Sequence, residues 1–211
     1  GKTILFEGAQ ATLLDIDFGT YPYVTSSHPL SAGVCTGTGV GPMTIDAIYG
    51  VAKAYTTRVG KGPFPTELND ETGDYIRNKG GEFGTITGRP RRTGWFDSVI
   101  VRHAVRVNGL SSLVINKLDT LAGLDTLKVC VAYKKPDGTI IKDFPPTLEG
   151  LEGCEPVYEE FKGFTDDLSA CRKFEELPEV CRKYISRLEE LCECPISMVG
   201  VGPDRAQVIE R

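Results

Sequence analysis

The densest group of ligand-binding side chains in this chain lies between residues 84 and 97. The segment reads Gly-Thr-Ile-Thr-Gly-Arg-Pro-Arg-Arg-Thr-Gly-Trp-Phe-Asp, with arginines at positions 89, 91 and 92. A guanidinium group is always charged and presents a planar fork of donors that matches carboxylates and phosphates. Glycines let the backbone approach a ligand closely, and Pro90 stiffens the turn between the arginines. We interpret this arginine loop as an anion clamp, and the alternative is a solvated basic surface loop.

A second candidate group, Asn116 to Asp119, follows a short apolar strand. Proteins of the α/β class present ligand-contacting residues at such strand ends. The carboxylate of Asp119 can accept hydrogen bonds from both N1–H and the exocyclic amine of guanine, a donor pair that adenine lacks. The stem of Lys117 can lie flat over the purine. The same four-residue pattern also occurs by chance at strand ends, so alone it does not decide between a guanine-binding site and a strand end with ordinary charges.

Three weaker groups complete the set. The small residues of Gly200-Val201-Gly202 follow another apolar strand and would let backbone groups touch the edge of a base. The amide of Gln10 both donates and accepts, which suits the amide-like edge of hypoxanthine. Thr25 and the two serines after it offer hydroxyl donors to a phosphate. Each group by itself is more typical of a turn or a strand end.

The chain offers no evident general base or nucleophile. Neither His28 nor His103 has an obvious carboxylate partner in the sequence, and we expect His103 to be structural. No serine or cysteine lies in the context of a nucleophile. The seven cysteines are scattered and complete neither a disulfide framework nor a zinc site, which favours a reduced, cytoplasmic protein. We expect no metal ligands within this chain.

Composition excludes several classes of partner. The 211 residues are 40% hydrophobic and 25% charged, enough for one sizeable core. A net charge of -5 argues against general binding to nucleic acid or to a membrane surface. No apolar run reaches the roughly 20 residues that span a bilayer.

The elements that must position these side chains alternate between strand and helix. This alternation predicts the α/β class, with a mainly parallel central sheet, flanking helices and antiparallel hairpin extensions. Asp97 is a favourable N-cap, and Pro136-Asp137-Gly138 predicts a hairpin turn. Between residues 18 and 41 we expect a long irregular segment. The predicted strands are 2–6, 55–59, 113–116, 127–133, 139–142, 157–160 and 196–201, and the predicted helices are 42–52, 70–79, 98–108 and 178–191.

Taken together, the motifs resemble the adenylosuccinate synthase family of GTP-dependent ligases. The matching segments follow the family's order over essentially the whole chain: 6–10, 15–22, 24–27, 57–67, the arginine loop, 116–119 and 202–205. The resemblance implies a ligase fold related to the P-loop NTPases, of which residues 1–211 would form the C-terminal portion. The glycine-rich phosphate loop, the catalytic Asp and His and the Mg²⁺ ligands would lie in an N-terminal half that is absent here.

The resemblance also implies a reaction and a set of contacts. GTP would phosphorylate O6 of IMP, and the amine of L-aspartate would displace phosphate to give adenylosuccinate. Gln10 would stabilise charge on O6 as the catalytic group. IMP would be bound by Gln10, Thr25, Val59 and Arg89, aspartate by Thr85, Ile86, Thr87, Gly88, Arg89 and Arg91, and GTP by Arg91, Lys117, Leu118, Asp119, Gly200, Val201 and Gly202. The full-length protein would be a homodimer, and the isolated chain would be inactive.

Three positions depart from the family pattern, and one alternative function stays open. Ile86 stands where a threonine is common, Gly200 where some members have a serine, and His28 where an asparagine is common. The alternative is a GTP-binding regulatory module, suggested by Asn116 to Asp119 alone. Such a module has no need of the arginine loop or of Glu7 to Gln10.

Overall fold

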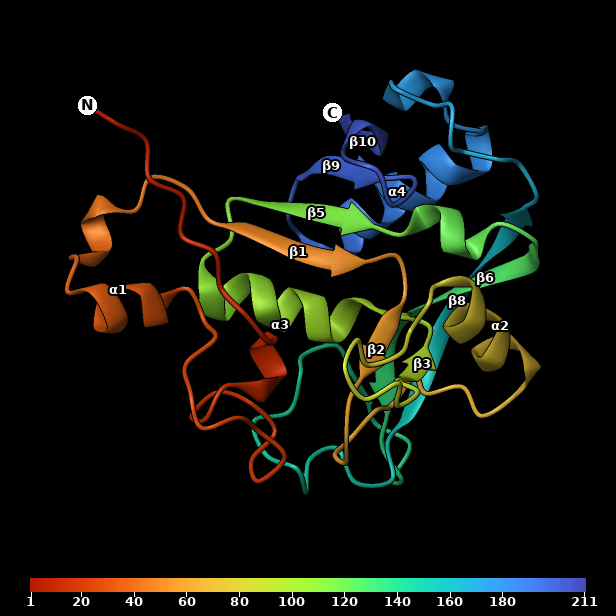
Figure 1. Cartoon of the computed structure of the whole chain (residues 1–211). Coiled ribbons are helices and arrows are strands. Elements are labelled where there is room, and N and C mark those ends of the chain that lie inside the picture. The colour runs from red at the N-terminus through yellow and green to blue at the C-terminus, as the bar shows by residue number, and fades with distance from the viewer.

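The computed structural model describes all of residues 1–211 and contains a mainly parallel sheet (Figure 1). Three parallel strands stand in the order β1-β5-β9, and β10 adds antiparallel at the far edge. The strands are β1 (Tyr49–Lys53), β5 (Ser112–Asn116), β9 (Ile196–Gly200) and β10 (Val208–Glu210). The predicted parallel core is therefore confirmed. β1 forms the other edge, where Tyr49 and Val51 are exposed.

A second sheet carries the antiparallel extensions. β6 pairs parallel with β4 and antiparallel with both β7 and β8. The turn at 136–138 joins β6 to β7, as the sequence predicts, while β8 is longer than the predicted strand at 157–160. The strands are β4 (Phe96–Asp97), β6 (Leu124–Lys134), β7 (Ile140–Ile141) and β8 (Glu155–Phe164).

The arginine loop has its own support. β2 (Thr56–Arg58) and β3 (Arg92–Gly94) pair antiparallel, and α2 (Glu71–Lys79) packs against β3. Asp70 caps α2 by accepting a hydrogen bond from the Gly73 N–H at 3.0 Å. The strand β3 forms part of the arginine loop, so its pairing with β2 and its packing against α2 anchor the loop.

Two longer helices close the core between the sheets. α3 (Ser98–Asn108) packs against α4 (Glu179–Cys192) and β6, and Figure 1 shows it running alongside β1. Asp97 caps α3 through the N–H groups of Val99 and Ile100, as predicted, and Gly109 ends the helix with φ 62°. Fully burying an aliphatic side chain such as Leu188 stabilises the fold by about 1.5–3 kcal/mol. No helix combines the length and the apolar character needed to cross a bilayer.

The first third of the chain departs from the predictions. Residues 2–6 form no strand, because no strand lies alongside to pair with them, and Ile4 and Leu5 are exposed. The predicted helix from Pro42 is a single 3-10 turn, η2 (Pro42–Thr44), and its apolar continuation is β1. Pairing with β5 outweighs the helical spacing there. The expected irregular segment contains a short helix, α1 (Ala32–Thr38). The remaining 3-10 turns are η1 (Thr12–Leu14), η3 (Leu118–Leu121), η4 (Phe174–Glu176) and η5 (Arg205–Gln207).

Candidate active site

Three parallel strands end side by side at one edge of the first sheet. Lys53 at the end of β1 is the ladder partner of Asn116 at the end of β5, and Val199 of β9 is the partner of Ile115. The segments that leave β5 and β9 therefore emerge next to each other. The structure brings together residues 117–119 and 200–202, as the sequence predicts for carboxyl ends of parallel strands.

The residues at this edge of the sheet differ in backbone conformation and in exposure. Lys117 adopts the left-handed conformation, with φ 62°, and begins the turn η3. Leu118 and Val201 are only 0% and 1% exposed, so both belong to the core. These values cover the whole residue, so their backbone atoms are covered as well as their side chains. A Cβ at Gly200 would lie 2.6 Å from Oδ1 of Asn116, so the glycine leaves room for this amide.

Asp119 is half-buried beside Lys117. Burial raises the pKa of Asp119, while the charge of Lys117 acts in the opposite direction. A carboxylate that has lost part of its hydration is well suited to accept hydrogen bonds from a donor pair on a base.

The arginine loop is a hairpin whose tip faces solvent. The N–H of Gly84 donates to the carbonyl of Arg89 at 2.8 Å, and the N–H of Gly88 donates to the carbonyl of Gly84 at 2.7 Å. Gly88 has φ 62°, a conformation that favours glycine. Thr85, Ile86 and Thr87 form the exposed tip, with Ile86 98% exposed.

The three arginines of the loop do not act as one clamp. Arg92 binds Glu67 with both Nε and Nη2 at 2.6 Å and also donates to the carbonyls of Gly60 and Gly62. Our interpretation of Arg92 as an anion ligand is therefore wrong, because its donors hold the base of the hairpin. Arg89 is exposed and forms no ion pair, so it is the arginine free to bind an anion.

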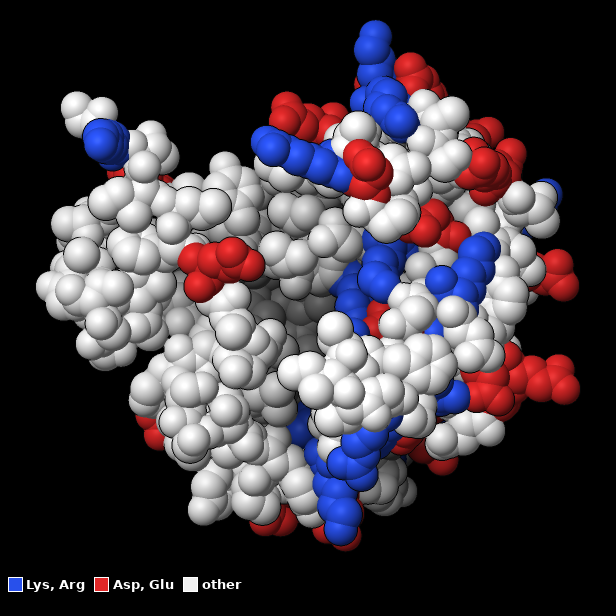
Figure 2. Space-filling view, viewed as in Figure 1, with Lys and Arg blue, Asp and Glu red and all other residues white.

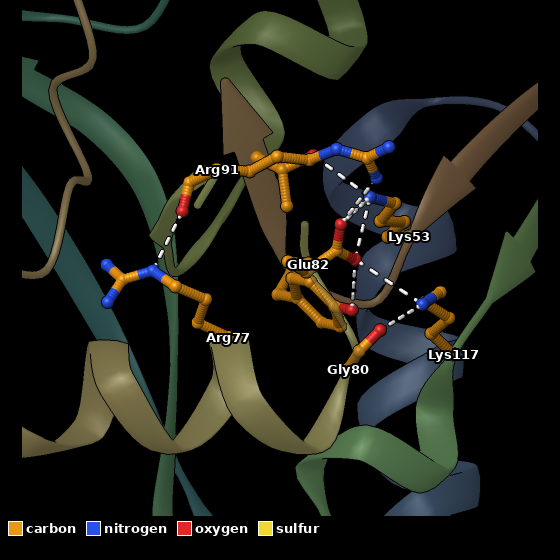
Figure 3. A network of polar contacts seen from close by, with 8 residues as sticks. Lys53, Arg77, Gly80, Glu82, Arg91 and Lys117 are labelled. Atoms are coloured by element: carbon orange, nitrogen blue, oxygen red, sulfur yellow. Dashed lines mark hydrogen bonds and ion pairs between the residues drawn. The ribbon is translucent and has the colours of Figure 1, made fainter. Parts of the chain in front are cut away.

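The centre of the site is Glu82, a residue that our sequence analysis missed (Figure 3). Its side chain is fully buried, and its oxygens accept hydrogen bonds from Lys53 at 2.8 Å, Tyr55 at 2.6 Å and Arg91 at 2.8 Å. The ammonium of Lys117 lies 3.5 Å away. The one signal in the sequence is an acid that follows Gly80-Gly81 just before the arginine loop.

The charge state of Glu82 follows from these partners. Burial opposes ionisation, but the hydrogen bonds from Lys53 and Tyr55 outweigh it and lower the pKa of Glu82 to about 2. The carboxylate is thus charged at neutral pH. Figure 2 shows a hollow on this face, with Lys and Arg side chains along one side of it. An excess of positive charge at a hollow favours an anionic ligand such as a polyphosphate or a carboxylate.

A second group lies around Arg58. This buried guanidinium donates from Nη2 to the hydroxyl of Thr20 at 2.8 Å and to the carbonyl of Tyr23 at 3.1 Å. It thereby fastens the segment that leads to Thr25 against the end of β2, where Val59 follows and is 67% exposed. Thr25 and Val59 therefore each lie within two residues of the hydrogen bond between Arg58 and Tyr23.

The structure does not join Gln10 to these groups. Gln10 is exposed, has φ 62° and forms no hydrogen bond with the arginine loop or with residues 117–119. The structure therefore links the arginine loop to Lys117 through Glu82, but it does not link Gln10 to either.

The two histidines have different surroundings. His28 does have carboxylate partners, which the sequence did not reveal: its Nδ1 lies 3.5 Å from Asp15 and 3.8 Å from Asp17. His103 packs its ring on Phe144 at 5.0 Å and has no hydrogen-bond partner for either nitrogen. Burial lowers the pKa of His103, which keeps it neutral and fits a structural role.

Asp15, Asp17 and His28 are close enough to share a cation. Mg²⁺ prefers an octahedron of oxygen ligands, whereas an imidazole suits zinc and other transition metals. One oxygen of Asp15 is also occupied by the N–H groups of Asp17 and Phe18. This donor set does not fit Mg²⁺, so we assign it no part in the chemistry below.

Comparison with known proteins identifies one family. The family model described as Adenylosuccinate synthetase matches residues 1–209. The chain is similar to the curated adenylosuccinate synthetase of Heliobacterium modesticaldum, 61% identical over 210 residues, which is 100% of this chain and 49% of that protein. That of Caldanaerobacter subterraneus is 59% identical over 209 residues, covering 99% of this chain and 49% of that protein.

Solved structures agree with this result. The fully ligated adenylosuccinate synthetase of Plasmodium falciparum superposes with a TM-score of 0.94 at 46% identity, over 97% of this chain and 49% of that chain. A cyanophage S-2L succinoaminodeoxyadenylate synthetase shares the fold, with a TM-score of 0.54 at 19% identity over 96% of this chain and 45% of that chain. The chain spans about half the length of the relatives that it matches.

Proposed function

This chain belongs to the adenylosuccinate synthetase family, and from that membership we propose that it is the C-terminal portion of an enzyme that joins L-aspartate to IMP. GTP would supply the phosphoryl group, and the products would be adenylosuccinate, GDP and phosphate, the first committed step of AMP biosynthesis from IMP. The proposal is supported by identities near 60% and by motifs in the family's order. We propose that the phosphate loop, the general base and the Mg²⁺ ligands lie in the other half of a homodimeric enzyme.

The observation that carries this proposal is the junction at Glu82. Through it, Arg91 of the arginine loop and Lys117 beside Asp119 contact one carboxylate. An amino-acid pocket built on the first segment and a nucleotide pocket built on the second would therefore lie near each other, which suits a ligase whose phosphoryl donor and amine must reach one substrate.

For the guanine pocket, we assign base reading to Asp119 and stacking to the stem of Lys117. Leu118, Gly200, Val201 and Gly202 would contribute backbone atoms only, and Leu118 and Val201, which are covered in this structure, would have to expose theirs when the nucleotide binds. The glycine at 200 removes a side-chain contact that a serine could make but leaves the backbone contacts in place.

For the aspartate pocket, we assign the free guanidinium of Arg89 to the substrate carboxylate, with Arg91 between aspartate and the GTP phosphates. Thr85, Thr87 and Gly88 would supply hydroxyl and backbone donors. Ile86 has no side-chain donor, so it can contribute only its backbone N–H.

For IMP, we assign phosphate binding to Thr25, ribose contacts to Val59 and Arg89, and the O6 edge to Gln10. A donor aimed at O6 would stabilise the negative charge that develops there during phosphoryl transfer. Gln10 would have to approach the other groups when ligands bind, because in this structure it forms no hydrogen bond with them.

The decisive experiment measures adenylosuccinate and phosphate formation by the intact protein and by the isolated chain. The intact protein is expected to form both products only when GTP, IMP and L-aspartate are all present with Mg²⁺. The isolated chain is expected to form none. Failure of the intact protein to react, or turnover by the isolated chain, would refute the proposal.

A further inference from the structure

Glu82 holds three cations that come from three separate segments of the chain. Lys53 is the last residue of β1, Arg91 belongs to the arginine loop, and Lys117 directly follows β5. Figure 3 shows these three side chains converging on one carboxylate. Of the groups that we assign to substrate binding, Glu82 contacts only Arg91 and Lys117.

The geometry divides the carboxylate between the two pockets. Oε2 accepts from Nη1 of Arg91 at 2.8 Å, and Oε1 lies 3.5 Å from Nζ of Lys117. Lys53 bridges both oxygens at 2.8 Å, and the hydroxyl of Tyr55 adds a fourth donor at 2.6 Å. Each oxygen is therefore tied to a different pocket, and a shift of one cation changes the position available to the other.

The backbone reinforces the same link. The N–H of Arg91 donates to the carbonyl of Glu82 at 2.9 Å, and Nε of Arg77 donates to the carbonyl of Arg91 at 2.9 Å. On the other side, the ammonium of Lys117 also donates to the carbonyl of Gly80. The short segment from Gly80 to Glu82 thus contacts both the arginine loop and the segment after β5.

Removal of the carboxylate charge would reverse the electrostatics of the cluster. Three partly exposed cations would then face each other around a buried neutral group, and like charges repel. Arg91 and Lys117 would move apart, and the position of one would no longer depend on the position of the other. Neutralising Glu82 would therefore disturb the position of Arg91 relative to Lys117, in addition to any loss of stability.

We propose that Glu82 is a positioning residue that couples the guanine pocket to the aspartate pocket. Guanine nucleotide that fixes Lys117 would favour the position of Arg91 that receives aspartate, and by thermodynamic reciprocity aspartate would favour nucleotide binding. This inference rests on the proposed function and adds to it the route by which the two substrates sense each other.

The test is initial-rate kinetics of the intact protein over a grid of GTP and aspartate concentrations, at saturating IMP. The grid yields an interaction factor, the fold by which one substrate changes the apparent affinity for the other. For the unmodified protein we expect a factor in the usual range of about 5–150-fold. In Glu82→Gln, which preserves size and removes charge, we expect the factor to fall to within roughly threefold of unity.

Glu67→Gln is the matched control. Glu67 also pairs with an arginine of the same hairpin, Arg92, but does not contact Lys117. It is expected to keep the interaction factor of the unmodified protein. If Glu82 had only a structural role, Glu82→Gln would change the total activity, as Glu67→Gln can do through Arg92, and would leave the interaction factor unchanged.

Glu82→Asp provides a second variant in case Glu82→Gln does not fold. Its carboxylate keeps the charge but is one methylene shorter, so it cannot reach Arg91 and Lys117 together, and we expect at least half of the coupling to be lost. An interaction factor equal to that of the unmodified protein, in whichever variant folds, overturns the inference. Absence of any reaction in the unmodified protein would instead refute the proposed function, so the two failures are distinguishable.

Discussion

The buried carboxylate of Asp97 is expected to lower the stability of the chain as the pH rises from 4 to 7. Asp97 is 1% exposed, accepts a hydrogen bond from the hydroxyl of Tyr133 at 2.7 Å and caps α3. Burial raises the pKa of Asp97 from 3.8 to about 6, although Tyr133 and the helix N–H groups act in the opposite direction. The folded chain therefore binds this proton more tightly than the unfolded chain does.

The sign and size of the effect follow from this difference. The contribution of Asp97 to stability is fully present below pH 3.8 and is lost as the pH rises through about 6. At 1.36 kcal/mol for each pKa unit, the loss is about 3 kcal/mol. Other carboxylates, such as Glu82 with its lowered pKa, contribute stability in the opposite direction, so the total pH profile does not isolate Asp97.

The assay is therefore a comparison of variants. Urea unfolding, followed by circular dichroism, gives the free energy of unfolding of the unmodified chain and of Asp97→Asn between pH 4 and 8. The unmodified chain minus the variant is expected to fall by about 2 kcal/mol over that range, less than the full loss because the unfolded carboxyl is already more than half ionised at pH 4. Asp125→Asn, which removes an exposed carboxylate from β6, controls for the change in net charge. A difference for Asp97→Asn that is constant with pH, or that rises with pH, would refute the reasoning.

Three further substitutions in the intact protein test the site. Arg89→Ala is expected to lower kcat/KM for aspartate by about 10- to 100-fold, because a charge-assisted hydrogen bond contributes about 1.5–3 kcal/mol; unchanged kinetics would count against the assignment. Asp119→Asn is expected to shift preference from GTP toward xanthosine triphosphate, and competition between the two nucleotides measures it; a retained preference for GTP contradicts base reading. Arg58→Met removes the bonds to Thr20 and Tyr23 and is expected to raise KM for IMP more than KM for GTP, whereas equal changes would argue against a local role.

Local signals predicted much of the fold. Asp97 caps the helix that it was expected to cap, because an N-cap depends only on the next few residues. The turn at 136–138 forms for the same reason. The neighbourhood of residues 117–119 and 200–202 could also be predicted, since parallel strands end at a common edge.

The remaining features depend on partners that are distant in sequence. Glu82 binds Lys53, which is 29 positions away, and nothing near Glu82 announces this contact. The apolar run at 2–6 has the composition of a strand but has no neighbour with which to pair. Arg92 looked like Arg89 in the sequence, and only the position of Glu67 distinguishes a structural arginine from a free one.

The exposed edge of β1 has a practical consequence for anyone who handles this chain alone. An unpaired edge strand offers free backbone N–H and C=O groups, and here Tyr49 and Val51 present apolar side chains beside them. We therefore expect two or more copies to associate through their β1 edges at high concentration, and light scattering would detect this association. A lysine in place of Val51 should keep the preparation monodisperse, because a charge on such an edge discourages unwanted strand addition.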